Sequence, residues 1–215
     1  MFFTRSPYQS VIDARLRQIP TENPYNSGWD RGDSQFDVRQ MLRLNGVYTL
    51  PFHRNRLVEG WGISSIMSFA TGLPFNVTDG LDNSKMGCTC ERPNLNPGFT
   101  ATNAITGNRT DWINPAAFSL PPLGVLGSLG RNTFRTPGLF DADVSMTRDK
   151  RIPEISEAFL VQFRAEFFNI TNHTNFGAPG GGIFTGNGAV SPTVGVITST
   201  NTSSRQIQFS LRLRF

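Results

Sequence analysis

The sequence predicts an all-β fold, an antiparallel meander of about five long strands. Apolar and polar residues alternate with a period of two in five stretches, which is typical of strands with two unlike faces. Only 17% of the 215 residues are charged, below the roughly 25% of an ordinary soluble domain. No stretch reaches the roughly 18 apolar residues of a membrane-spanning helix. A helical membrane protein is therefore excluded.

The alternation is clearest in the predicted C-terminal strand, 204–215. Its apolar side chains are Ile207, Phe209, Leu211, Leu213 and Phe215. Every residue between them is polar. A helix would spread these side chains around its circumference, whereas a strand places all of them on one face.

The same alternation predicts four further strands upstream. They are expected at 35–51, 60–78, 138–149 and 158–170. The first two run to about 17 residues, well past the five or six of a typical globular strand. The first and third strands carry apolar residues at even-numbered positions, and the others carry them at odd-numbered positions. We therefore expect a meander whose neighbours follow chain order.

The connections between these strands alternate in length. Those at 52–59 and 150–157 are short, whereas those at 79–137 and 171–203 are long. Short turns on one side and long loops on the other are typical of a bacterial outer-membrane barrel. The pattern predicts an open segment of a transmembrane β-barrel with long external loops and a periplasmic C-terminus. The glycines at 180–182, inside the second long loop, are interpreted as flexible loop residues.

In that barrel the two faces of the sheet meet different surroundings. The predicted lipid-facing residues are Phe159, Val161, Phe163, Phe167 and Ile207. The predicted lumen-facing residues are Arg39, Arg43, Arg164, Glu166, Arg212 and Arg214. Outer-membrane lipid is therefore an expected partner.

A soluble β-sandwich remains open as the alternative, because its strands also alternate apolar and polar residues. Such a module would bind carbohydrate or protein. The loop aromatics Trp29, Trp112 and Phe118 would form its site. A folded, monodisperse protein in plain buffer would favour this alternative.

Charge and chemistry-bearing residues point to no further site. The net charge is +4, but the arginines are scattered rather than clustered, so no nucleic-acid partner is expected. Cys88 and Cys90 are interpreted as a free pair or a local disulfide, because a metal site would need two more ligands. His173 is interpreted as a turn residue. Asp141 and Asp143 are interpreted as lumen-facing carboxylates.

Enzyme motifs are missing from the sequence. It contains no Gly-x-Ser-x-Gly elbow, no His-Glu-x-x-His and no phosphate loop. We therefore expect no enzyme activity, no catalytic residue, no cofactor and no metal site.

An ordered set of motifs carries a family resemblance. Two of them read Ala70-Thr71-Gly72-Leu73-Pro74-Phe75 and Asn114-Pro115-Ala116-Ala117-Phe118. The full set lies at 31–39, 48–52, 60–61, 70–77, 92–95, 112–118, 129–132, 164–177 and 195–200, followed by the terminal strand. Together they resemble the C-terminal barrel end of TonB-dependent outer-membrane receptors of the Oar-like group.

The resemblance implies energised nutrient uptake in the outer membrane of a Gram-negative bacterium. It implies a barrel segment at 34–215, preceded by an irregular external-loop remnant at 1–33. The family's plug, its TonB box and most of its roughly 22 strands are missing here, so the chain is expected to be a fragment that cannot transport alone. TonB would act only through the missing plug, and the transported ligand is not specified.

The terminal strand resembles the signal that the barrel assembly machinery reads. Outer-membrane barrels of this kind end on an aromatic residue preceded by alternating apolar positions. The matching residues are Phe209, Leu211, Leu213 and Phe215. An unpaired strand of this kind can add to a sheet edge of an assembly protein.

Overall fold

A computed structural model of the chain describes residues 22–23, 25–26, 28–51 and 59–215. The chain divides into two compact units. Unit 1 comprises Met1–Arg39, Thr71–Gly138 and Phe176–Asn201, and unit 2 comprises Gln40–Ala70, Leu139–Asn175 and Thr202–Phe215. Each unit is described by itself below.

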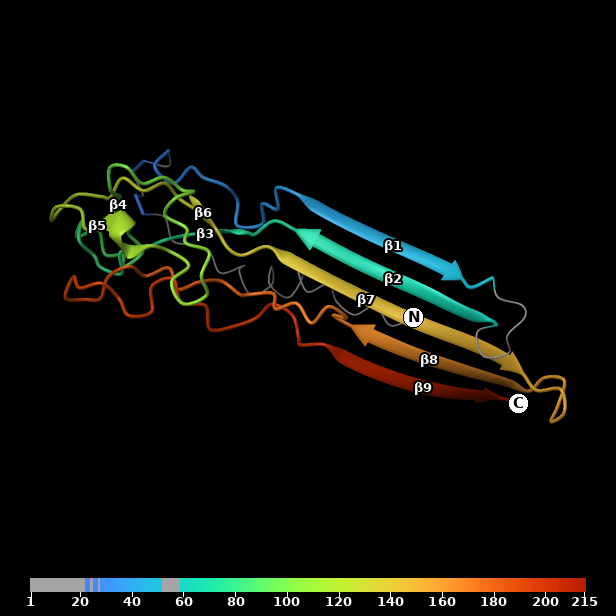
Figure 1. Ribbon diagram of the computed structural model, residues 1–215. Helices are drawn as coiled ribbons and strands as arrows, with labels where there is room; N and C mark the ends of the chain where they lie inside the picture. Colours follow the sequence, from blue (N-terminus) through green and yellow to red (C-terminus); the bar gives the residue numbers. More distant parts are fainter. Residues whose placement is uncertain (1–21, 24, 27, 52–58) are drawn as a thin grey trace. The chain divides into compact units, whose positions relative to one another are not determined.

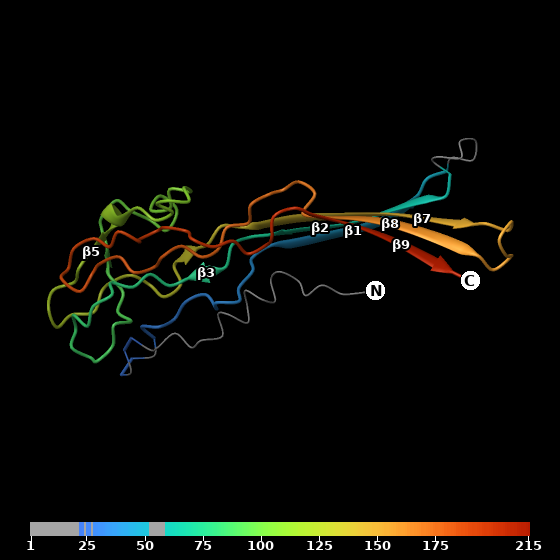
Figure 2. The ribbon, with the colours of Figure 1, turned by 90° about the horizontal axis from the view of Figure 1, so that it is seen from below.

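Unit 2 is a five-stranded antiparallel sheet whose strands follow one another in chain order (Figure 1). The strands are β1 (Met41–Thr49), β2 (Trp61–Ala70), β7 (Leu139–Arg151), β8 (Leu160–Phe168) and β9 (Gln206–Arg214). Viewed close to its edge, the sheet is one layer thick (Figure 2). The predicted all-β meander is therefore confirmed, and the sheet is not closed into a barrel.

The first two strands are shorter than predicted. β1 has 9 residues and β2 has 10, not about 17. Lengths of 9 to 11 residues are those that a tilted barrel strand needs to cross a bilayer. The prediction of unusually long strands was wrong, but the observed lengths fit a membrane barrel better.

The prediction for β2 failed because the chain leaves the sheet after Ala70 while staying extended. At Gly72 a Cβ atom would lie 1.7 Å from the carbonyl oxygen of Thr136, so only glycine permits this approach. The Thr136 amide then donates to the carbonyl of Leu73 at 2.9 Å. An extended backbone keeps the alternation running after the strand has ended.

The segment after Gly72 joins a small sheet of unit 1. Strand β3 (Pro74–Phe75) pairs with β6 (Phe134–Arg135). A second short pair joins β4 (Asn94–Leu95) to β5 (Phe118–Ser119), which follows the 3-10 turn η1 (Pro115–Ala117).

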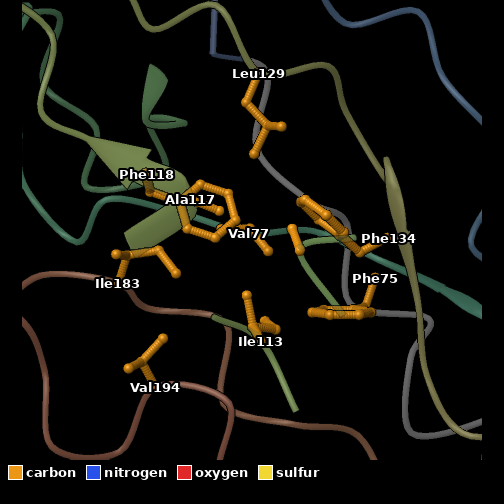
Figure 3. Close-up of a cluster of buried hydrophobic side chains, with 10 residues drawn as sticks. Phe75, Val77, Ile113, Ala117, Phe118, Leu129, Phe134, Ile183 and Val194 are labelled. Atoms are coloured by element: carbon orange, nitrogen blue, oxygen red, sulfur yellow. The ribbon is translucent and has the colours of Figure 1, made fainter. Parts of the chain in front are cut away.

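Unit 1 has a hydrophobic core, which the two long connections build together (Figure 3). The core residues are Phe75, Val77, Ala104, Ile113, Ala117, Phe118, Leu129, Phe134, Ile183 and Val194. The long connections predicted at 79–137 and 171–203 therefore belong to a folded unit with its own core. Apolar residues spaced too irregularly to show a period meet here across more than 60 positions of sequence.

The glycines at 180–182 lie at a close backbone approach. The amide of Thr78 donates to the carbonyl of Gly181 at 2.9 Å, and a Cβ on Gly181 would lie 2.6 Å from the carbonyl oxygen of Asn76. Interpreting these glycines as flexible loop residues was wrong, because they let two segments pack backbone to backbone.

The structure also decides against the soluble sandwich. Within unit 2, no second sheet packs on the five strands in the part of the chain that is described. Phe118, one of the three proposed site aromatics, is a core residue with 5% exposure. The indole of Trp112 donates to the carbonyl of Arg135 at 3.1 Å. Phe118 and Trp112 are therefore engaged inside unit 1 and do not form the exposed aromatic site that was expected.

The two short turns differ in what is described. Of 52–59, residues 52–58 lie outside the described residues, including His53 and Arg54. The other turn begins after Arg151, two residues beyond the predicted strand end, and closes where the amide of Phe159 donates to the carbonyl of Ser156 at 3.0 Å. No helix in the described part of the chain is long and apolar enough to cross a membrane.

Candidate lipid-facing surface and buried ionic cluster

Strand register gathers the apolar residues of all five strands on one face of unit 2. Ile63 stands opposite Tyr48 on one side and opposite Met146 on the other. Phe163 stands opposite Leu211. The apolar face thus combines the even positions of β1 and β7 with the odd positions of β2, β8 and β9, which confirms the predicted parity of each strand.

Aromatic side chains pack against each other across this apolar face. Trp61 meets Phe163 edge to face at 5.8 Å between ring centroids. Phe69 stacks on Phe140 at 4.7 Å. The aliphatic side chains remain open, and Leu211 is 64% exposed. No described segment covers this wide apolar face, and an exposed apolar face of this extent marks a surface of contact with an apolar partner.

Four of the five predicted lipid-facing residues are strand residues of this face, and the fifth, Phe159, lies just outside β8. Val161, Phe163, Phe167 and Ile207 are strand residues of it. Phe159 lies one residue before β8 and is buried, with its ring 5.3 Å from that of Phe215. That these residues meet lipid stays a prediction.

The opposite face of the sheet is mainly polar. The Arg164 guanidinium lies 3.3 Å from the Glu166 carboxylate, and the Gln162 amide donates to Asp149 at 2.9 Å. Arg43, Arg212 and Arg214 share this face.

Arg39 is the exception among the predicted lumen-facing residues. It lies before β1, in unit 1, where its guanidinium donates to Asp33 at 3.1 Å. The predicted strand 35–51 was wrong at its start because Asp33 and Asp37 both bind Arg135, which keeps this segment in unit 1. The hydrogen bond from Arg135 lowers the pKa of the exposed Asp33.

Asparagines organise the chain where β8 ends. The Asn175 side chain donates to the carbonyl of Phe140 and accepts from the same residue's amide, both at 2.8 Å, so it replaces a strand partner of β7. Asn169 adopts φ +48° and its amide donates to Asp143 at 2.9 Å. His173 follows this strand end and is exposed, and its ring lies 5.6 Å from that of Phe140.

A buried arginine is the centre of the ionic cluster of unit 1, which consists of Glu22, Asp30 and Arg92. Arg92 is 1% exposed and pairs with Glu22 and, at 2.7 Å, with Asp30. Its Nε also donates to the carbonyl of Leu129 at 2.8 Å. Burial raises the pKa of Glu22, and the hydrogen bond from the Arg92 backbone amide, followed by the charge of the Arg92 guanidinium, opposes that shift.

Two more buried carboxylates lie beside this cluster. Glu91 accepts the amides of Asn83 and Ser84, both at 3.0 Å. Asp79 accepts the Leu81 amide at 3.0 Å through Oδ1. Its Oδ2 has no hydrogen-bond partner among the residues described. Burial, followed by the charges of Glu91 and Glu22, raises the pKa of Asp79 to about 6.

This ionic cluster was hard to predict from the sequence. Glu22, Asp79, Glu91 and Arg92 were not singled out from sequence, because charged residues in loops normally lie in solvent. The one available signal was the resemblance at 92–95, which includes Arg92.

Cys88 and Cys90 form a disulfide, one of the two interpretations left open. Elsewhere in the described ranges, no group of three or more His, Cys, Asp or Glu residues is arranged to hold a metal ion.

Comparison with known proteins identifies the family. Residues 7–208 match the family model described as an outer membrane beta barrel domain, and the chain belongs to that family. Comparisons with curated proteins and with solved structures found no significant match. The family agrees with the open antiparallel sheet and indicates an outer-membrane protein.

Proposed function

We propose that this chain forms part of the barrel wall of an Oar-like TonB-dependent receptor, which takes up a nutrient across the outer membrane of a Gram-negative bacterium. The supporting observation is the register, which produces one apolar and one mainly polar face from five strands of different parity. The ordered motifs from 31–39 to 195–200 point to the receptor group. We assign the chain no enzymatic role and no nucleic-acid partner.

The open sheet edges indicate that further strands complete the wall. The outer edges of β1 and β9 have no strand partner among the described residues. Unpaired backbone groups cost several kcal/mol each in hydrocarbon. Transport then requires a closed barrel with a plug that contacts TonB, so the chain contributes wall and external loops rather than complete uptake.

Photo-crosslinking tests which face meets lipid. A benzophenone amino acid at Phe209, on the apolar face, should crosslink to lipid in outer membranes that contain the complete protein. The same group at the neighbouring Gln208, on the polar face, should not. Equal lipid crosslinking at both positions would contradict a barrel wall.

A binding measurement tests the receptor assignment separately. The purified periplasmic domain of TonB should bind the complete protein, and removal of the protein's plug should abolish binding. An assembled barrel that retains its plug but does not bind TonB would contradict the receptor assignment while leaving the barrel wall intact.

The orientation of the sheet has its own test. With the C-terminus periplasmic, protease added to intact cells should cut near Lys85 or Arg109 and spare Arg54. Cleavage at Lys85 only after the outer membrane is permeabilised would reverse the orientation.

We further propose that the terminal strand is read by the barrel assembly machinery. Phe209, Leu211 and Leu213 lie exposed along the apolar face of β9, and Phe215, just after β9, is 90% exposed. An edge strand with this arrangement can pair with another sheet while its side chains fill pockets.

Substitution of the last residues tests this proposal. Phe215→Ala should lower the amount of assembled, protease-resistant protein in the outer membrane. The matched control Arg214→Ala, on the polar face, should leave that amount nearly unchanged. If neither substitution changes the assembled amount, the terminal strand is a wall element only.

A further inference from the structure

Three arginines form a positive patch on the polar face of unit 2. Arg151, Arg212 and Arg214 lie on this face because odd positions of β7 and even positions of β9 point to it. They lie at the turn-side end of the sheet, where β7 enters its turn and β9 finishes (Figure 1). All three are exposed and form no ion pair with any residue that the structure describes.

The strand register places the arginines of the positive patch close together. Arg151 and Arg214 stand on either side of Leu160, so their backbones are about 10 Å apart, or two strand spacings. Arg212 lies two residues from Arg214, roughly 7 Å along the strand. Like charges at these separations repel one another, so the patch favours a partner with negative charge.

The two carboxylates of this half of the polar face already have partners. Glu166 pairs with Arg164 at 3.3 Å. Asp149 accepts a side-chain amide of the neighbouring strand at 2.9 Å. Within the described strands, four arginines thus share the turn-side half of the polar face with two carboxylates.

Other carboxylates of unit 2 do not compensate the positive patch. Glu154 and Glu157 belong to the exposed turn and pair with no described arginine. Asp141 and Asp143 lie on the other half of the polar face. Asp143 precedes Arg151 by eight residues, which is roughly 27 Å along a strand. The excess of positive charge is therefore local to the turn-side end.

Two exposed aliphatic side chains interrupt the same polar face on β1 and β2. Val47 is 83% exposed and Ile66 is 57% exposed. Val47 stands opposite Ser64 and Ile66 stands opposite Asn45, so the two aliphatic residues are diagonal neighbours, roughly 7–8 Å apart. One partner can cover both of them.

We propose that the polar face docks the plug of the complete receptor, with an acidic surface of the plug on the positive patch and apolar plug residues on Val47 and Ile66. Water in the lumen would leave the arginines unpaired and the aliphatic side chains solvated. A small anion would pair with the arginines but would not cover the aliphatic side chains. A protein surface does both, because protein interfaces combine apolar contacts with complementary charges. This inference rests on the proposed function, because only a closed barrel surrounds a plug.

Photo-crosslinking inside the complete protein tests this docking. A benzophenone amino acid replaces Leu160, which stands between Arg151 and Arg214, and outer membranes that contain the protein are irradiated. Proteolysis and mass spectrometry then identify the crosslinked peptide, which should come from the plug and carry a net negative charge. The same group at the next residue, Val161, lies on the apolar face and should not crosslink to the plug.

Charge variants test whether the arginines hold the plug. Arg212→Glu should lower crosslinking from Leu160 to the plug by roughly five-fold, the upper range for one exposed ion pair, and added salt should lower it in the unsubstituted protein. The matched control Arg205→Glu changes an exposed arginine that precedes β9 and should leave crosslinking unchanged. If Arg212→Glu lowers the assembled amount, the milder Arg212→Gln should still reduce crosslinking per assembled barrel.

Three outcomes would overturn the proposal. Crosslinking to a neutral or basic plug peptide contradicts the charge match, and so does crosslinking that neither Arg212 variant reduces. If Leu160 crosslinks to no plug peptide while Phe209 crosslinks to lipid, the docking fails and the barrel wall stands. If Phe209 does not crosslink to lipid either, the proposed function fails as well.

Discussion

The two units bury their side chains in opposite ways. In unit 1, Ile113, Phe134 and Ile183 are at most 1% exposed and belong to one hydrophobic core (Figure 3). In the sheet of unit 2, Phe209 and Leu211 are more than 60% exposed. Unit 1 therefore carries its own apolar interior, whereas the apolar face of unit 2 depends on something outside the described chain.

Polar groups follow the same division. Unit 1 buries an arginine and several carboxylates and pairs most of them internally. Unit 2 places most of its charges on the polar face, where the Arg164 and Glu166 side chains stay 46% and 26% exposed. Burial makes a charge dependent on its partner, so substitutions of charged residues should affect the two units very differently.

The largest effect is expected at the centre of unit 1. Arg92→Met leaves the carboxylates of Glu22 and Asp30 buried without their cation, and breaking a buried pair in this way costs about 3–5 kcal/mol. Hydrogen exchange of the complete protein should show lost protection for the amides of Asn83 and Ser84. Protection in the strands of unit 2 should change much less.

The control for that prediction is an exposed ion pair of the same unit. Arg39 is 64% exposed where it pairs with Asp33, so Arg39→Gln should cost less than about 1 kcal/mol. Equal loss of protection in both variants would show that burial does not control the stability of unit 1.

The next largest effect should distinguish the two faces of unit 2. Val144 stands in a middle row of the apolar face, between Ser65 and Phe167. Val144→Arg should destabilise the barrel in vesicles by about 2–4 kcal/mol, the cost of an arginine at the bilayer midplane. Ser145→Arg, one residue on and on the polar face, should cost under about 1 kcal/mol. Reversible unfolding by urea in lipid vesicles measures both, and equal costs would contradict a lipid-facing surface.

The sheet was predictable because its signal is local. Alternation in β8 and β9 assigns each side chain to a face from its immediate neighbours. The register then aligns the apolar faces of the two strands, for example by placing Phe163 opposite Leu211. Ends were less predictable. Alternation continued through Leu73 and Phe75 although the chain had left the sheet, because any extended segment with one buried side alternates.

Unit 1 was not predictable because its contacts join distant segments. Phe75 and Val194 belong to one core. The backbone amide of Arg92 donates a hydrogen bond to the carboxylate of Glu22, which lies 70 residues away in the sequence. Neither the irregular spacing of the core residues nor single charges in polar loops has a period that reveals a partner. The disulfide between Cys88 and Cys90 was one of the two interpretations left open, because a metal site would need two more ligands.

A pH-dependent effect is expected at Asp79. Since folding raises the pKa of Asp79 from 3.8 to about 6, the fold favours the protonated carboxyl. Its stabilising contribution is complete below about pH 4 and is lost as the pH rises through about 6. Asp79→Asn should remove this dependence and stabilise unit 1 at pH 8 by up to about 3 kcal/mol.

Hydrogen exchange at Asn83 and Ser84, corrected for intrinsic rates, measures this effect between pH 4 and 8. The control Asp111→Asn changes an exposed carboxylate and should leave the pH dependence as it is. The interpretation of Asp79 as a buried, unpaired carboxylate fails if Asp79→Asn is destabilising at pH 8.

The smallest effect is expected for the ion pair on the polar face of unit 2. Arg164 and Glu166 lie two residues apart on β8, 3.3 Å from each other, and both remain partly exposed. Water screens such a pair and the two side chains lose entropy in forming it, so exposed pairs contribute about 0.2–1 kcal/mol. A double-mutant cycle of Arg164→Ala and Glu166→Ala, measured by urea unfolding in vesicles, should give a coupling energy in that range. A coupling near the 3–5 kcal/mol expected of a buried pair would mean that this face is shielded from water in the assembled barrel. The contrast between the two units would then be one of apolar burial only, and not of charge burial.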